Sequence, residues 1–444
     1  MAESCVVNIL PGELQLSILD LLSALDARRA ATVCRSWRDV VAQLDTSLCL
    51  VTASGDNEVV LLDGRGRVVQ RIKAKPVPRK RGGRMIHPVV LKRWTTWPTC
   101  IATGPRGDLF VSQYKVQGIL QFVRTPIGYE YRRTLASGSR FASPEGIVFA
   151  HDSIYLVCVD SGTIARLSMS GQLLEVSKPF ERTNDYGELE FFVMWGMCIN
   201  DGPHGDGHLY IAAHVGEEGN DDYERPTAVD TGGILRQRLR PDGSFDGDTE
   251  GFAGYPMAQT FVQPNCAYVD LNRPSEPSVC EHGFLHVSSF VSSGQHGLPV
   301  PRHGNARRVY KFSTELSVLP GNAWARVGCG GDSARGLCYG WLETSDDEDA
   351  ELLKAPWGVS CAPSGVLLTC HGVDVPVPVV KLGSCGCAGL RCDPSAPRNA
   401  MWKGLDCSHL PTSFSNDPFV FRCEAKPFTR APMNQANAVE HIVR

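Results

Sequence analysis

The stretch from Ser143 to Glu175, SPEGIVFAHDSIYLVCVDSGTIARLSMSGQLLE, predicts four short β-strands joined by turns. An apolar run follows the opening Pro144-Glu145-Gly146, and a β-branched and aromatic run extends from Ile154 to Val159. A third strand is expected at Ile164 to Leu167 and a fourth, outer strand at Leu173 to Val176, because turn residues separate these runs. Four strands of this length cannot bury both faces alone, so the unit should stack against copies of itself.

Related units recur along the chain, each with an opening tripeptide and a second strand of matching type. The opening tripeptides are Pro98-Thr99-Cys100, Pro144-Glu145-Gly146, Met194-Trp195-Gly196, Pro264-Asn265-Cys266 and Pro356-Trp357-Gly358. The second strands contain Leu109-Phe110-Val111, Ile154-Tyr155-Leu156, Leu209-Tyr210-Ile211, Leu285-His286-Val287 and Val366-Leu367-Leu368. The first copies are spaced by about the 40 to 50 residues of a propeller blade, and radial stacking is therefore expected.

This order of strands and turns resembles the NHL and related six-bladed β-propellers over roughly residues 50 to 425. The resemblance implies a mainly β fold over 48–425, with six blades. The segment Leu48 to Lys73 lacks an opening strand, and a late segment such as Phe419 to Arg422 is expected to supply it and close the ring. The remaining expectations are inserted loops at 216–233, 299–308 and 320–354, a Cys-rich segment at 383–423 and a C-terminal tail at 426–444.

Composition narrows the class of protein. The chain has 444 residues, is 43% hydrophobic and carries a net charge of −4, which argues against a general nucleic-acid or membrane role. It has 17 cysteines, but several of them, such as Cys158 and Cys361, lie within apolar strands and suit small core positions. There is no recognisable signal peptide, and the longest apolar run, Phe191 to Ile199, is too short to span a bilayer. A cytoplasmic or nuclear location is expected.

Residues 8 to 44 have a helical period, unlike the rest of the chain. Apolar residues recur every four positions from Leu10 to Leu22 and every three or four positions from Ala30 to Leu44, which predicts two amphipathic helices. A unit of about 40 residues is too small to sustain a core of its own. Its apolar surface therefore needs a second surface, either the propeller or another protein.

The landmarks of this segment, from Leu10-Pro11-x-Glu13-Leu14 to Val33-Cys34-x-x-Trp37-Arg38, resemble an F-box, and the expected helical domain spans 1–47. The resemblance implies docking on the Skp adaptor of a cullin-RING ubiquitin ligase. One departure is Asp26-Ala27, where the family commonly has Asp-Leu. By resemblance, the residues that carry the contact or the packing beneath it are Leu10, Pro11, Leu14, Ile18, Leu22, Val33, Cys34 and Trp37. The alternative is an amphipathic hairpin packed on the propeller.

The residue after each opening residue is expected near one mouth of the propeller. These positions hold Thr99, Glu145, Trp195, Asn265 and Trp357. Tryptophan is enriched where proteins bind one another, so this set is the candidate target-binding surface. The alternative is that these side chains wedge between neighbouring blades.

The sequence contains three features that could indicate other chemistry. Glu145 and Asn265 could be oxygen ligands of a metal-dependent lactonase- or esterase-like propeller, but two tryptophans at equivalent positions would crowd a hydrated ion. The weak zinc candidates Cys385, Cys387, Cys392, Cys407 and His409 lack the paired spacing of common zinc modules. The basic loop Lys73 to Arg84 has no interleaved aromatic residues for stacking RNA bases. No cofactor, metal or catalytic residue is predicted.

The sequence thus predicts a non-catalytic substrate-recognition subunit of a Skp-cullin-F-box ubiquitin ligase. A short helical F-box would bind the Skp adaptor, and an NHL-like propeller would bind a target protein. Loop composition does not encode which protein that target is.

Overall fold

The computed structural model describes the chain from Leu48 to Ile442, with gaps. The described residues are 48–73, 97–114, 118–125, 128–138, 140–141, 143–183, 189–200, 207–216, 231–254, 271–272, 274–280, 284–289, 309–313, 338–344, 356–362, 365–370, 378–382, 420–423, 425–429, 431–433 and 436–442. Across these residues the structure is β-strand, with one short 3-10 turn, η3 (Val159–Ser161), and no α-helix. The predicted F-box helices lie outside the described residues.

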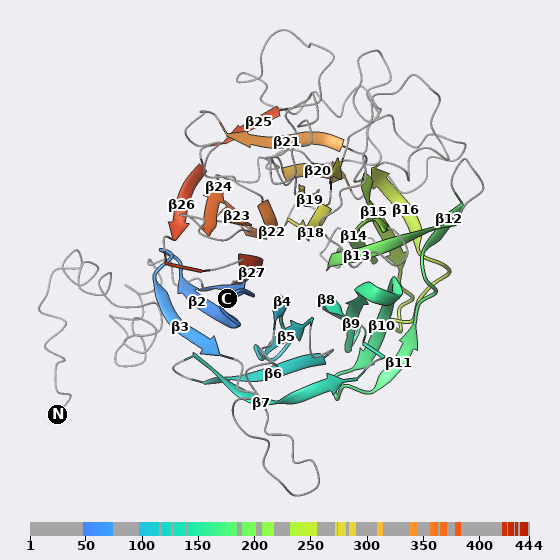
Figure 1. The fold of residues 1–444 in the computed structure, drawn as a ribbon, viewed down its shortest axis with the longest axis horizontal. Coiled ribbons are helices and arrows are strands. Elements are labelled where there is room, and N and C mark those ends of the chain that lie inside the picture. Colours follow the sequence, from blue (N-terminus) through green and yellow to red (C-terminus); the bar gives the residue numbers. More distant parts are fainter. Residues whose placement is uncertain are drawn as a thin grey trace, which may run out of the picture.

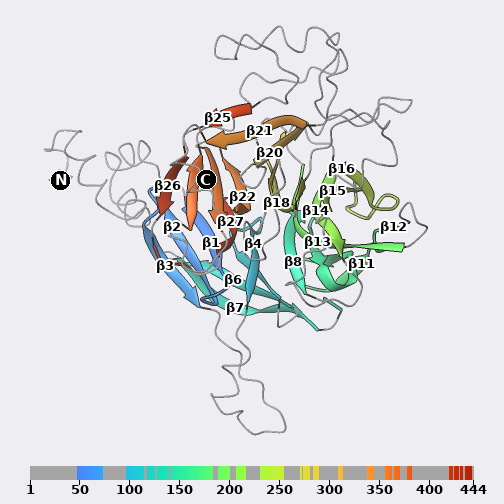
Figure 2. The ribbon, with the colours of Figure 1, turned by 45° about the horizontal axis from the view of Figure 1, so that its top comes forward.

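The described strands form six sheets that surround one axis, as Figure 1 shows, so the predicted mainly β propeller is confirmed. Correspondence to NHL repeats in particular stays a prediction. Seen obliquely in Figure 2, the sheets stand side by side around the ring.

Three of the sheets are built from strands of the N-terminal half of the described chain and from β27 at its C-terminal end, and their neighbouring strands pair antiparallel. In hydrogen-bonded order the first contains β27 (Ala436–Ile442), β1 (Leu48–Ala53), β2 (Glu58–Asp63) and β3 (Val68–Lys73). The second contains β4 (Pro98–Thr103), β5 (Leu109–Gln113), β6 (Gly118–Thr125) and β7 (Gly128–Ser137). The third contains β8 (Pro144–Ala150), β9 (Ser153–Cys158), β10 (Thr163–Ser168) and β11 (Leu173–Val176), the four strands predicted for this stretch.

The other three sheets carry the inserted segments. One contains β12 (Glu181–Thr183), β13 (Leu189–Ile199), β14 (His208–Gly216), β15 (Thr231–Arg238) and β16 (Glu250–Gly254), with β17 (Leu271–Asn272) paired to β15. The next contains β18 (Pro274–Val279), β19 (Phe284–Ser289), β20 (Val309–Ser313), β21 (Cys338–Thr344) and β25 (Val420–Cys423). The last contains β22 (Pro356–Ala362), β23 (Gly365–Cys370), β24 (Val379–Leu382) and β26 (Ala425–Thr429).

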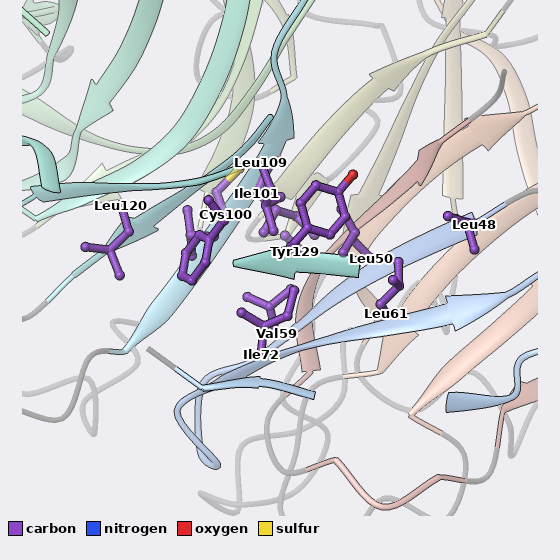
Figure 3. Packing of buried hydrophobic residues seen from close by; sticks show 13 residues of the cluster. Leu48, Leu50, Val59, Leu61, Ile72, Cys100, Ile101, Leu109, Leu120 and Tyr129 are labelled. Carbon is purple, nitrogen blue, oxygen red and sulfur yellow. Dashed lines mark hydrogen bonds between the residues drawn. The ribbon is translucent and has the colours of Figure 1, made fainter. Parts of the chain in front are cut away.

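Apolar side chains from neighbouring sheets meet between them and form the core. Between the sheets of β1 and β4, for example, Leu50 and Leu61 pack in one cluster with Ile101 and Leu120, as Figure 3 shows. Equivalent clusters fill the next two spaces, where Tyr155 and Ile154 of β9 are completely buried on opposite faces of one strand. Each completely buried large side chain contributes about 1.5 to 3 kcal/mol of transfer free energy. Stacking of sheets, rather than any single sheet, therefore supplies the core.

The two ends of the described chain meet in one sheet. Strand β27 pairs antiparallel with β1, with Leu50 opposite Glu440. The expectation that a late segment supplies the missing opening strand is confirmed, but the segment named was wrong. Residues Val420–Cys423 instead form β25, which runs parallel to β21 in another sheet. The residues expected to be a tail, 426–444, thus contribute strands to two sheets.

The opening strand of one sheet also differs from the expectation. The second strand containing Leu285-His286-Val287 pairs with β18, which begins at Pro274, whereas Pro264-Asn265-Cys266 lies outside the described residues. Because proline lacks a backbone hydrogen-bond donor, Pro274 and Pro277 argue against a strand, and the sequence did not predict one here. Both prolines are tolerated because β18 pairs on one side only and its register shifts between them.

Candidate functional site

The innermost strand of every sheet carries an irregularity at the same position. The register shifts between Pro98 and Ile101, Pro144 and Ile147, Met194 and Met197, Pro274 and Pro277, Pro356 and Val359, and opposite Val51 and Ala53 in β1. Such bulges re-aim the residues that they contain. The first residue inside each bulge, in order around the axis, is Asn437, Thr99, Glu145, Trp195, Ser275 and Trp357.

Buried hydroxyl groups tie these bulges to one another. Ser112 of β5 accepts a hydrogen bond from Cys100 N at 2.9 Å and donates one to the carbonyl of Glu145, in the next sheet, at 2.8 Å. Thr52 of β1 does the same, accepting from Ala438 N at 2.8 Å and donating to the Thr99 carbonyl at 3.2 Å. Each hydroxyl therefore fixes its own bulge and the adjacent innermost strand together.

The same link recurs on the other side of the ring. Thr369 accepts from Gly358 N at 2.7 Å and donates to the Asn437 carbonyl, and Ser288 donates to the Trp357 carbonyl. In the two remaining sheets the equivalent positions, opposite the bulges, are Val157 and Ala212. Side chains without a hydroxyl cannot make this link. The bulge residues are thus anchored by hydroxyl groups at four of the six junctions.

Sequence reasoning missed these hydroxyl groups, although a signal was present. Ser112, Ser288 and Thr369 each directly follow an aligned second-strand tripeptide, as Ser112 follows Leu109-Phe110-Val111, whereas Thr52 lies in a segment outside that alignment. The aligned position holds serine or threonine wherever the link is made. Asn437 was also missed, because β27 was expected to be a tail.

Glu145 is the acidic member of the set. It lies at the bulge of β8 and is 7% exposed. Burial raises the pKa of its carboxyl to about 8, and a hydrogen bond with the Thr99 side chain lowers that pKa in part. The Thr99 hydroxyl lies 3.0 Å from the Ser112 hydroxyl and 3.1 Å from the carbonyl of Pro144. A largely neutral carboxyl at pH 7 can donate as well as accept hydrogen bonds.

Trp195 and Trp357 come together although their strands are not neighbours. Their ring centroids lie 5.5 Å apart and the rings are nearly perpendicular, at 84°. Strand β18 stands between β13 and β22 in the ring of Figure 1, so this contact joins two sheets that are not neighbours. Trp195 is 9% exposed, and Trp357 is half-buried. The alternative that these side chains pack between neighbouring blades therefore agrees with the burial of Trp195, while Trp357 keeps accessible surface.

The structure places four of the five residues predicted for the mouth at equivalent bulges, where Thr99 interacts with Glu145 and Trp195 with Trp357. Asn265 lies outside the described residues. The remaining predicted sites also lie there, namely the F-box residues Leu10, Pro11, Leu14, Ile18, Leu22, Val33, Cys34 and Trp37 and the weak metal candidates Cys385, Cys387, Cys392, Cys407 and His409. Their roles stay predictions.

Two further searches covered the part of the chain that the structure describes. No group there brings together three or more histidine, cysteine, aspartate or glutamate side chains in a way that could hold a metal ion. None of its helices has the length and apolar character needed to cross a membrane.

Comparisons with known proteins separate the two parts of the chain. Residues 7–50 match the family model described as F-box-like, which ends within β1. A search of curated proteins finds no match.

Solved structures resemble the chain over most of its length at low sequence identity. A chain of a nidogen/laminin complex is 12% identical, with a TM-score of 0.45 over 89% of this chain and 98% of that one. A putative 6-phosphogluconolactonase from Bacteroides uniformis is 10% identical, with a TM-score of 0.42 over 90% of this chain and 100% of that one. Virginiamycin B lyase from Staphylococcus aureus is 10% identical, with a TM-score of 0.34 over 74% of this chain and 92% of that one. The family-model match and the ring of sheets together give the chain an F-box-like segment and a β-propeller.

Proposed function

We propose that this chain is the substrate-recognition subunit of a Skp-cullin-F-box ubiquitin ligase, acting in the cytoplasm or nucleus. The F-box-like segment docks on the Skp adaptor, and the propeller binds a target protein. The observation that carries the proposal is the match of residues 7–50 to the F-box-like model, immediately ahead of a closed ring of sheets. The ring closes between β1 and β27, which pair antiparallel.

In this proposal the chain performs no bond chemistry. Holding a target beside a ubiquitin carrier converts a bimolecular encounter into a local one, which raises the effective concentration of the reacting groups. A rigid receptor suits this role because it fixes the distance between target and carrier. The hydroxyl links of Thr52, Ser112, Ser288 and Thr369 support such rigidity, since each joins two adjacent sheets.

The target-binding surface is proposed at the axis of the ring, around Trp195 and Trp357. Aromatic residues supply large contact areas at a low cost in conformational entropy and are enriched among residues that dominate binding energy. Trp357 keeps exposed surface while Trp195 supports it from the side, at a ring-centroid distance of 5.5 Å.

The test is a pull-down of the purified Skp adaptor with the full-length chain and a double variant, Leu14→Ala with Trp37→Ala. We expect the variant to lose the adaptor, because both residues belong to the apolar set of the F-box-like segment. The matched control is Leu174→Ala with Val176→Ala, which removes two exposed apolar side chains from β11, each 48% exposed. The control should retain the adaptor, and undiminished capture by the F-box variant would refute the proposal.

A further inference from the structure

The residues around the axis divide into a polar side and an aromatic side. Asn437, Thr99 and Glu145 follow one another on the adjacent strands β27, β4 and β8, and all three are buried. The pair of indoles, Trp195 and Trp357, occupies the other side. A group at the axis would therefore meet a carboxyl with its amide and hydroxyl neighbours on one side and two aromatic rings on the other.

Glu145 lies directly beside the first indole. A Cβ added to Gly146 would approach Met197 N to 2.7 Å and the Gly196 carbonyl carbon to 3.1 Å, so the backbones after Glu145 and Trp195 touch. Glycine at position 146 permits this contact. Since both bulges have the same register, the close approach makes Glu145 and Trp195 neighbours along the ring.

No basic side chain of the described residues compensates the Glu145 carboxyl. The strands that pack against β8 from the same side, β4 and β5, contain no charged residue, and β9 contributes only Tyr155 and Cys158 as titratable groups. Asp152, the nearest described acid along the chain, is exposed, and Asp160 accepts a hydrogen bond from Ser143 at 2.6 Å. Strand β13 brings Glu190, whose side chain is outside the described set. A buried carboxyl normally has a cationic partner or several hydrogen-bond donors.

The chemistry of this site selects an organic cation. Ammonium and guanidinium groups bind over the faces of tryptophan rings, and a buried carboxylate supplies the opposite charge. A calcium or magnesium ion needs about six or more oxygen ligands, more than the described side chains provide with one carboxyl, one amide and one hydroxyl. An anion would be repelled by the ionised carboxylate.

We propose that Glu145, Trp195 and Trp357 form a site for an organic cation, namely the side chain of a lysine or arginine presented by a target protein. That the cation belongs to a ubiquitylation target rests on the proposed function. The binding of the cation itself depends only on the residues at the axis.

Binding should release a proton from the site. Burial raises the pKa of the Glu145 carboxyl to about 8, so at pH 7 the carboxyl must ionise before it can pair with a cation. With that pKa, the ionised fraction rises from roughly one hundredth at pH 6 to roughly nine tenths at pH 9. The apparent Kd for a cation should therefore fall by about two orders of magnitude over this range.

The experiment titrates the full-length chain with Nα-acetyl-lysine methylamide and, separately, with its arginine equivalent, using isothermal titration calorimetry at pH 6, 7, 8 and 9. Nα-acetyl-norleucine methylamide is the neutral control ligand because it keeps the aliphatic stem and lacks the charge. We expect at least one cation to bind about tenfold or more tightly than norleucine at pH 9, with an affinity that rises with pH.

Three variants locate the site. Glu145→Gln keeps the shape of the side chain and should weaken cation binding about tenfold or more at pH 9 while removing its pH dependence. Trp357→Leu should weaken it several-fold. The matched control is Glu440→Gln, because Glu440 is a half-buried carboxyl whose pKa desolvation raises to about 7, and it accepts a hydrogen bond from Thr103 N–H at 2.8 Å on a neighbouring strand. It should bind cations as the unmodified chain does.

Equal binding of the cations and norleucine would overturn the site, as would full cation affinity in Glu145→Gln. Either result leaves capture of the Skp adaptor unaffected, because the F-box-like segment is tested in a separate pull-down. Failure of this inference is therefore distinguishable from failure of the proposed function.

Discussion

Replacing Thr52 with valine tests whether hydroxyl links hold the ring together. Thr52 is completely buried in β1, next to the strand that closes the ring. Its hydroxyl accepts a hydrogen bond from Ala438 N at 2.8 Å and donates one to the Thr99 carbonyl at 3.2 Å. These two bonds join β1 to the innermost strands β27 and β4. Valine has nearly the same shape, so the substitution removes two hydrogen bonds and leaves the packing in place.

The expected loss follows from these two bonds. A buried N–H left without an acceptor costs about 1 to 3 kcal/mol, and the lost bond to the carbonyl costs about 0.5 to 1.5 kcal/mol. We therefore expect Thr52→Val to lower the free energy of unfolding by about 2 to 4 kcal/mol. This is a large share of the roughly 5 to 15 kcal/mol that stabilises a typical folded protein.

The assay is urea unfolding, followed by circular dichroism, with the slope and midpoint fitted together. Thr163→Val is the matched control, because the Thr163 hydroxyl bonds with Ser161 Oγ at 2.7 Å and with the Cys158 thiol, both within the segment that joins β9 to β10. It should cost less than about 1 kcal/mol. Equal losses in the two variants, or a loss below about 0.5 kcal/mol in Thr52→Val, would refute the claim that these links stabilise the ring.

Three further predictions follow from the structure. Burial raises the pKa of Glu145 from 4.5 to about 8, so between these values the folded chain holds a proton that the unfolded chain lacks. Stability therefore falls as pH rises toward 8, by up to about 1.4 kcal/mol per pH unit, and levels off above it. Glu145→Gln should flatten this dependence between pH 6 and 9 in urea unfolding, and an unchanged slope would contradict the assignment. Tyr155→Phe should cost about 1 kcal/mol, because the Tyr155 hydroxyl donates to the Gly243 carbonyl of the next sheet at 2.5 Å; no change in the unfolding midpoint would argue against that link. Removing residues 436–444 deletes β27 and exposes the edge of β1, so cooperative unfolding should be lost and the chain should aggregate on gel filtration. A monomeric, cooperatively unfolding product would show that closure is dispensable.

Most of the fold could be predicted from the alternation of turn residues with short β-prone runs. The runs from Ser143 to Glu175 alternate between turn residues and β-branched or aromatic residues, and all four predicted strands are present as β8 to β11. Copies of that pattern located the second strands correctly, because Leu285-His286-Val287 and its equivalents combine high β-propensity with burial.

Local pattern failed where long-range contacts decide the structure. Strand β27, ANAVEHI, has few β-branched residues, and its pairing with β1 depends on a partner nearly 400 positions away in sequence. Strand β18 contains two prolines, which usually argue against a strand, yet its position next to the axis leaves one side unpaired. Neither feature can be read from neighbouring residues.

The candidate site was predictable in part for the same reason. Equivalent positions in the repeats identified Thr99, Glu145, Trp195 and Trp357 as a set. The contact between Trp195 and Trp357 was not predictable, because their strands belong to sheets that are not adjacent. The hydroxyl links between sheets could not be predicted either, because the strand register decides whether a serine or threonine hydroxyl lies opposite a bulge.

The most direct test of the central claim is the equilibrium binding of the purified Skp adaptor to the full-length chain, measured by isothermal titration calorimetry. The account predicts a complex of one adaptor per chain with a Kd of about 1 μM or tighter, a binding free energy of about −8 kcal/mol or below. Leu14→Ala with Trp37→Ala should abolish the binding heat while the unfolding midpoint of the propeller stays unchanged. Absence of binding by the unmodified chain, or equal binding by the double variant, would contradict the account.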